Sequence, residues 1–66
     1  ENLANAIVLQ AAKDYRAARR KLKEKPGNTL AQAEIDSIER FFCSGWYKCL
    51  TDVDGEMLIR KLREED

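Results

Sequence analysis

Apolar residues recur at every third or fourth position along the first third of the chain, which is the spacing of one face of an α-helix. The members of this stripe are Leu3, Ile7, Ala11, Tyr15, Ala18 and Leu22. The pattern predicts a helix over residues 3–24, with Asn2 as its candidate N-cap. Pro26 and Gly27 follow. They predict a turn that ends the helix, because the residue before a proline is pushed out of the α region.

A second apolar stripe predicts a helix over residues 30–42. Its members are Ala31, Ile35, Ile38 and Phe42, with Leu30 and Phe41 beside them. Thr29 precedes the stripe and Gln32 stands three residues after it, a spacing typical of a capping box. We therefore expect Thr29 to be the N-cap of this helix.

Two shorter helices are predicted in the last third of the chain. Ser44 is a candidate N-cap for a helix over residues 45–50. Thr51 and Asp54 have the spacing of a second capping box, which predicts a helix over residues 52–64. The apolar positions of this last helix are Val53, Met57, Leu58, Ile59 and Leu62.

The predicted fold class is all-α, in a single small domain over residues 1–66. The first two helices should form a long antiparallel hairpin, because a short connection places consecutive helices side by side. We expect the segment from Phe41 to Leu50 and the last helix to close the open side of this hairpin.

The composition excludes several functional classes. The chain has 66 residues, of which 44% are apolar and 36% are charged, and it has no histidine. A membrane span or a secretory signal does not fit, because the longest apolar run extends only from Ala6 to Leu9. A zinc site lacks ligands, and no nucleophile–base pair or phosphate-binding glycine loop is present. We expect a cytoplasmic protein that is not an enzyme and binds no cofactor or metal.

Cys43 and Cys49 allow two interpretations. In the first, they are half-buried thiols in a reducing compartment, since a free cysteine behaves as a small apolar residue. Alternatively, they form a disulfide or a redox pair.

Charge is segregated along the chain although the net charge is zero. Residues 1–25 carry seven Lys or Arg and three Asp or Glu, a balance of +4, whereas residues 26–66 carry five and nine, a balance of −4. On the first predicted helix, the side away from the apolar stripe carries Lys13, Arg16, Arg19, Arg20 and Lys23. This basic face is either an ordinary solvated surface or a contact for phosphates or an acidic partner.

Four of the five aromatic residues lie within seven positions, as Phe41, Phe42, Trp46 and Tyr47. Neighbouring residues on a helix point about 100° apart, so both members of each adjacent pair are hard to bury in a small domain. The buried members belong to the core. The exposed members would form an aromatic patch that anchors a partner, as Trp and Tyr often do at interfaces.

The second half of the chain carries a run of residues that resembles a known group of proteins. The run consists of Glu39-Arg40-Phe41-Phe42, Ser44, Trp46-Tyr47, Leu50-Thr51, Asp54-Gly55, Leu58-Ile59 and Leu62. It is similar to small uncharacterised helical proteins encoded by prophages and integrative elements of Gram-positive bacteria. The resemblance implies a bacterial host cell and a mobile-element gene, and it assigns no catalytic residue. Small proteins of that origin often act by binding a host or phage factor.

We therefore expect a non-enzymatic protein-binding module, or an accessory or inhibitory protein of a mobile element, that acts through the aromatic patch. The alternative is a nucleic-acid-binding protein that uses the basic face. A homodimer is a further hypothesis, because Leu9 falls on the polar side of the first helix, beside Val8 and Ala12, and so small a chain has a thin core.

Overall fold

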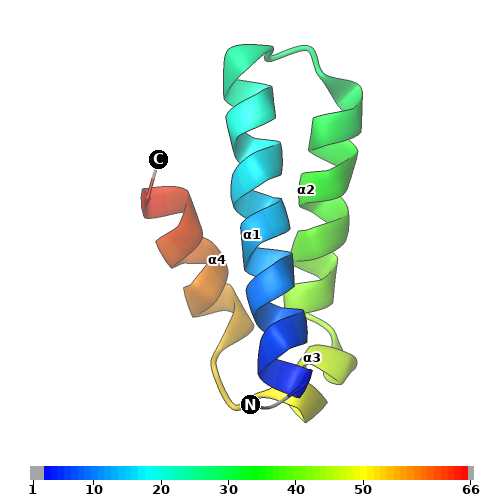
Figure 1. The fold of residues 1–66 in the computed structure, drawn as a ribbon, viewed down its shortest axis with the longest axis vertical. Coiled ribbons are helices and arrows are strands. Elements are labelled where there is room, and N and C mark those ends of the chain that lie inside the picture. The colour runs from blue at the N-terminus through cyan, green and yellow to red at the C-terminus, as the bar shows by residue number, and fades with distance from the viewer. Residues whose placement is uncertain (1–2, 66) are drawn as a thin grey trace.

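The four predicted helices are present in the computed structural model, which describes residues 3–65. Within these residues the elements are α1 (Leu3–Glu24), α2 (Thr29–Phe42), α3 (Gly45–Leu50) and α4 (Gly55–Glu64). Asn2 lies outside the described residues. Helices α1 and α2 form a long antiparallel hairpin, α3 lies across the end where α1 begins, and α4 runs along the hairpin (Figure 1). The all-α hairpin closed by two further helices is thus confirmed.

Helix α2 begins one residue earlier than predicted, because Asn28 and not Thr29 is its N-cap. The Asn28 side chain accepts a hydrogen bond from the Ala31 amide at 3.1 Å, and its backbone is extended. Asn caps a helix at least as well as Thr. The Gln32 side chain donates to Asp36 at 3.0 Å and takes no part in a capping box.

Helix α4 begins three residues later than predicted. Asp54 is its N-cap and accepts from the Glu56 amide at 3.0 Å. The Thr51 hydroxyl accepts from the Val53 amide at 3.2 Å and so closes the preceding turn. The predicted capping box is therefore wrong: both side chains bond to amides two residues further along the chain. Ser44, by contrast, caps α3 as predicted, accepting from the Tyr47 amide at 3.1 Å.

The core lies where α1, α2 and α4 meet and is closed at one end by α3. Its buried apolar side chains are Ala12, Tyr15, Ala18, Ala31, Ile35, Phe42, Tyr47, Ile59 and Leu62. The predicted stripes supply most of these residues. Four predicted apolar positions are exposed instead. Leu3 and Leu30 are each 77% exposed near the end of their helices, and Met57 of α4 is 48% exposed. Val53 is 54% exposed and lies before α4 begins, so it is not a position of that helix as predicted. Ala12, which was expected beside exposed Leu9, is buried because α4 packs on that side of α1.

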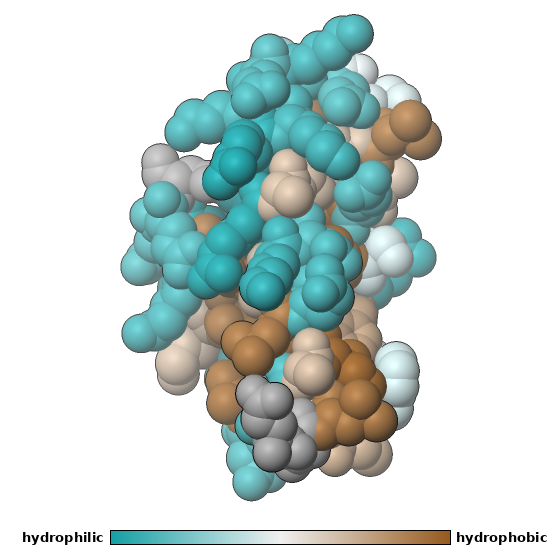
Figure 2. All heavy atoms as spheres, in the orientation of Figure 1, coloured by the Kyte–Doolittle hydropathy of each residue, from teal (hydrophilic) through white to brown (hydrophobic). Residues whose placement is uncertain are grey.

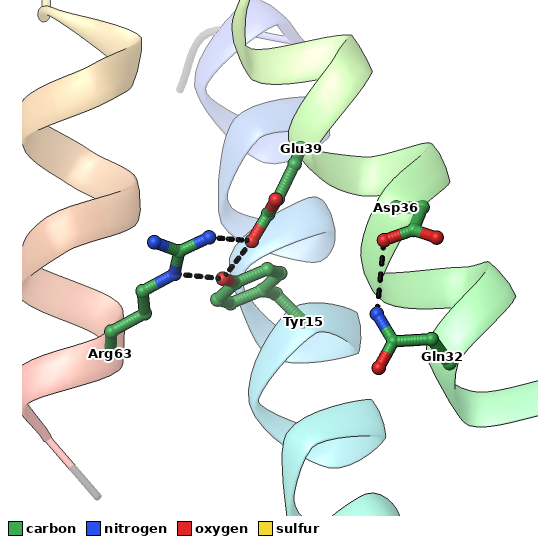
Figure 3. A network of polar contacts seen from close by, with 5 residues as sticks. All are labelled: Tyr15, Gln32, Asp36, Glu39 and Arg63. Carbon is green, nitrogen blue, oxygen red and sulfur yellow. Dashed lines mark hydrogen bonds and ion pairs between the residues drawn. The ribbon is translucent and has the colours of Figure 1, made fainter. Parts of the chain in front are cut away.

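A polar network joins the three long elements at the edge of the core (Figure 3). The Tyr15 hydroxyl of α1 donates to the Glu39 carboxylate of α2 at 2.6 Å. Arg63 of α4 donates to the same carboxylate oxygen at 2.6 Å and to the Tyr15 hydroxyl at 3.2 Å. One residue from each helix therefore fixes the position of α4 on the hairpin.

The network shifts the pKa values of Tyr15, Glu39 and Arg63. Burial raises the pKa of Glu39, but the hydrogen bonds from Tyr15 and Arg63 outweigh it and leave the pKa below its ordinary value. Burial, followed by the hydrogen bond to Glu39, raises the pKa of Tyr15. The Glu39 carboxylate also raises the pKa of Arg63. Glu39 is therefore held as a carboxylate between two donors.

Candidate functional site: an apolar groove along the hairpin

The structure separates the four residues of the predicted aromatic patch into two classes. Phe42 and Tyr47 are each 1% exposed and belong to the core, whereas Phe41 is half-buried and Trp46 is 61% exposed. Each adjacent pair thus sends one ring inward, as the helical geometry requires. Only Phe41 and Trp46 can contact a partner directly.

The turn between α2 and α3 positions Trp46. The Ser44 hydroxyl donates to the Phe41 carbonyl at 2.7 Å while it accepts from the Tyr47 amide. The same side chain therefore joins the end of α2 to the start of α3. These two hydrogen bonds stabilise the turn across which the two aromatic pairs meet.

The aromatic rings form a continuous chain from the core to the surface. Tyr15 and Phe42 have ring centroids 6.3 Å apart, and Phe42 and Phe41 are 5.6 Å apart. Trp46 then meets Phe41 edge to face at 5.6 Å. Rings at such distances and angles attract each other beyond the effect of burial alone. The exposed indole of Trp46 therefore contacts a ring that is itself packed against the core.

Phe41 and Trp46 lie at one end of a groove between α1 and α2. A hollow of about 360 Å³ is lined by Ile7, Gln10, Ala11, Asp14, Ser37, Ile38, Phe41 and Trp46. A second hollow of about 470 Å³ shares Asp14, Ser37 and Ile38 with the first and extends to Leu30, Ala33 and Glu34. Together they form one groove that follows the hairpin, and we call it the hairpin groove.

The hairpin groove is apolar along its floor and acidic at its rim. Among the described residues that line it, the charged side chains are Asp14 from α1 and Glu34 from α2, and both are carboxylates. Gln10 donates to Asp14 at 3.0 Å and so orients it. The groove therefore presents apolar contact area together with negative charge.

The hairpin groove lies on the face of the hairpin that α4 leaves uncovered. None of the described α4 residues lines either hollow. Helix α4 instead packs on the face that carries Tyr15 and Glu39 (Figure 3). The expected closure of the hairpin is thus confirmed on one face only.

The predicted basic face is partly engaged within the molecule. Arg16 makes two bonds to the Glu65 carboxylate, at 2.6 and 3.0 Å. Arg19 is half-buried, with its guanidinium 5.9 Å from the centre of the Tyr15 ring. Lys13, Arg20 and Lys23 are exposed. Arg16 and Arg19 therefore already make contacts within the protein.

Figure 2 shows how polarity is distributed over one face of the molecule. Hydrophilic side chains cover its upper and middle parts, and apolar side chains gather at its lower end, near the start of α1. Leu9 is 62% exposed and Met57 is 48% exposed. These residues are not part of the hairpin groove.

The remaining candidate groups show no organised chemistry. Cys43 and Cys49 are both free and exposed, so neither the predicted half-burial nor a disulfide is present. Within residues 3–65, no cluster of three or more Cys, Asp or Glu side chains could hold a metal ion. No helix of that part of the chain has the length and apolar character needed to cross a membrane.

Sequence reasoning identified Phe41 and Trp46 but missed the rest of the hairpin groove. The missed residues keep helical spacing, since residues 7, 11 and 14 follow one line on α1, and residues 30, 34, 37 and 41 follow one on α2. These lines run beside the core stripes, and periodicity alone does not distinguish their residues from core or solvated positions. The helical spacing of the groove residues is therefore visible in the sequence. It can be interpreted as a groove only once the face of the hairpin that α4 covers is known.

Comparisons with known protein families, with curated proteins and with solved structures give no match for this chain.

Proposed function

We propose that the protein is a non-enzymatic binding module that holds a protein partner in the hairpin groove. The observation that supports this proposal best is the exposed indole of Trp46, 61% accessible at one end of a groove with an apolar floor. Aromatic residues held rigidly beside an apolar pocket are typical centres of protein interfaces. The resemblance to prophage and integrative-element proteins points to a bacterial partner, of the host or of the element.

Site-specific crosslinking in cells that naturally carry the gene tests this proposal. The photoreactive residue p-benzoylphenylalanine replaces Ser37 in the groove or, as a control, Glu64 on α4. We expect a discrete protein adduct from position 37 and none from position 64. The adduct should be lost in Trp46→Ala and kept in Leu9→Ala, which removes an equally exposed apolar side chain elsewhere. Absence of a position-37 adduct would contradict the proposal.

Nucleic-acid binding through the basic face is the second candidate function. It is supported by the exposed cations Lys13, Arg20 and Lys23 along one side of α1. Its test is binding to short duplex and single-stranded DNA over a salt series, because phosphate contacts weaken steeply as salt rises. The charge reversals Arg20→Glu and Lys23→Glu should abolish such binding. Binding that is insensitive to salt or to these variants would count against it.

Self-association through Leu9 is a separate hypothesis about a separate surface. The Leu9 side chain is 62% exposed. Sedimentation velocity at rising concentration tests it, with Leu9→Lys as the disrupting variant. A wild-type chain that remains monomeric at high concentration would remove the hypothesis.

A further inference from the structure

The chain itself shows how its hairpin binds a helix. On one face, α4 buries Ile59 and Leu62 against α1 and α2. At the edge of that contact, the Glu39 carboxylate of α2 accepts from Arg63 of α4 at 2.6 Å. The helix is thus held by an apolar stripe together with a basic residue that meets an acidic residue of the hairpin.

The hairpin groove offers the same two features on the opposite face. Its floor is apolar, formed by half-buried residues such as Ala11, Ile38 and Phe41. Its rim carries the carboxylates of Asp14 and Glu34, one from each helix. Asp14 and Glu34 are therefore placed to accept hydrogen bonds from basic residues of an incoming segment, as Glu39 accepts one from Arg63 of α4.

The backbone of the occupant must satisfy its own hydrogen bonds. Residues 3–65 contain helices and turns but no strand, so the groove has no sheet edge to which an extended peptide could add. A buried backbone without partners is costly, and an α-helix bonds its own amides and carbonyls. A helix lying along two antiparallel helices also follows the packing of ordinary helix bundles.

From these observations we propose that the hairpin groove binds an amphipathic helix of another protein, one whose apolar stripe is flanked by Arg or Lys. This inference rests on the proposed function and names the chemistry of the partner. A second copy of the chain fits less well, because two grooves placed face to face would bring four carboxylates together. A nucleic acid fits less well too, because its phosphates would meet the same carboxylates.

Designed peptides test the inference directly. One peptide is an 18-residue helix with a leucine stripe flanked by arginines, and the other has glutamates in place of the arginines. A helix of that length is about 27 Å long, and the molecule is 35 Å long. Trp46 is the one tryptophan of the chain, so its emission reports occupation of the groove by peptides that lack tryptophan.

We expect the arginine peptide to shift the Trp46 emission to shorter wavelength and to bind at least tenfold more tightly than the glutamate peptide. The double variant Asp14→Lys, Glu34→Lys should reverse this preference, whereas Glu64→Lys should leave it unchanged. Equal binding of the two peptides, or a preference that survives the double reversal, would overturn the inference. So would a wild-type dimer that is lost in Trp46→Ala, because the occupant would then be a second copy.

The peptide experiment and the crosslinking experiment test separate claims. A Trp46-dependent protein adduct at position 37, combined with no preference for the arginine peptide, would retain the proposed function and reject the basic helix. Absence of any position-37 adduct would reject the proposed function itself, whatever the peptides do.

Discussion

Of the three glycines, Gly55 has the least room for a side chain. A Cβ atom placed on it would lie 1.9 Å from the Phe42 carbonyl oxygen and 3.4 Å from the Tyr47 ring. The start of α4 therefore touches the backbone at the end of α2. Gly27 and Gly45, in contrast, have no atom within 4 Å of such a Cβ.

Gly55→Ala should destabilise the protein by about 2–3 kcal/mol, because the added methyl group forces α4 away from α2 and strains the packing. The free energy of unfolding in urea, followed by circular dichroism, measures the loss. Gly27→Ala is the matched control and should change stability by less than about 1 kcal/mol. A Gly55→Ala variant as stable as this control would refute the close approach.

The two tyrosines should both ionise late. Burial raises the pKa of Tyr15 and of Tyr47, and the charge of Asp54 adds to the effect at Tyr47. A pKa raised by folding favours the folded state below the ordinary value of 10.0, and this contribution is lost as the pH rises through the raised value. We expect tyrosinate absorbance and loss of helical signal to appear together above pH 10. Ionisation of the tyrosines near the ordinary value of 10.0, without unfolding, would contradict the burial of both hydroxyls.

At the level of elements, the sequence determines the helices well and their first residues less well. The bounds of α1 and α3 were predicted correctly from apolar spacing, the Pro26 turn and the Ser44 cap. The starts of α2 and α4 were missed because several capping residues stand close together. Local spacing alone does not decide among such candidates, whereas packing does, as the contact of Gly55 with α2 illustrates.

The N-cap of α2 is Asn28 in the structure, whereas the sequence predicts Thr29. Asn28→Ala should cost about 1 kcal/mol of stability, because the Ala31 amide loses its acceptor. Thr29→Ala should cost much less, since Thr29 is an exposed first helical residue. Thermal unfolding of the two variants under identical conditions decides between the caps. A larger loss for Thr29→Ala would restore the predicted capping box.

For the whole molecule, the sequence predicted most of the side chains that each helix buries. It did not predict which face of the hairpin α4 covers and which face it leaves open. The basic segment, with its balance of +4, and the acidic segment, with its balance of −4, are joined at the surface by the ion pair between Arg16 and Glu65. Placing α4 on one face of the hairpin engages part of the basic face and leaves the hairpin groove open. Neither result follows from helical periodicity, because both depend on contacts between residues far apart in the sequence.

The three-helix network makes stability depend on pH. Because folding lowers the pKa of Glu39, its contribution is present above the ordinary value of 4.5 and is lost as the pH falls through the lowered value. Glu39→Gln should therefore be less stable than wild type by about 1–2 kcal/mol at pH 7, and the two should converge in acid. Urea unfolding from pH 7 to pH 2.5 tests this, with Glu64→Gln as the control. A constant difference at every pH would show that the Glu39 charge contributes nothing.

The attachment of α4 also sets the order in which the molecule opens. Helix α4 has ten residues, too few to persist alone in water, and the ion pairs at its C-terminal end are partly exposed to solvent. It should therefore detach as one unit while α1 and α2 stay paired. Native-state hydrogen exchange should then show two classes of amide protons, with those of α4 exchanging at a lower opening free energy than those at the centre of α1.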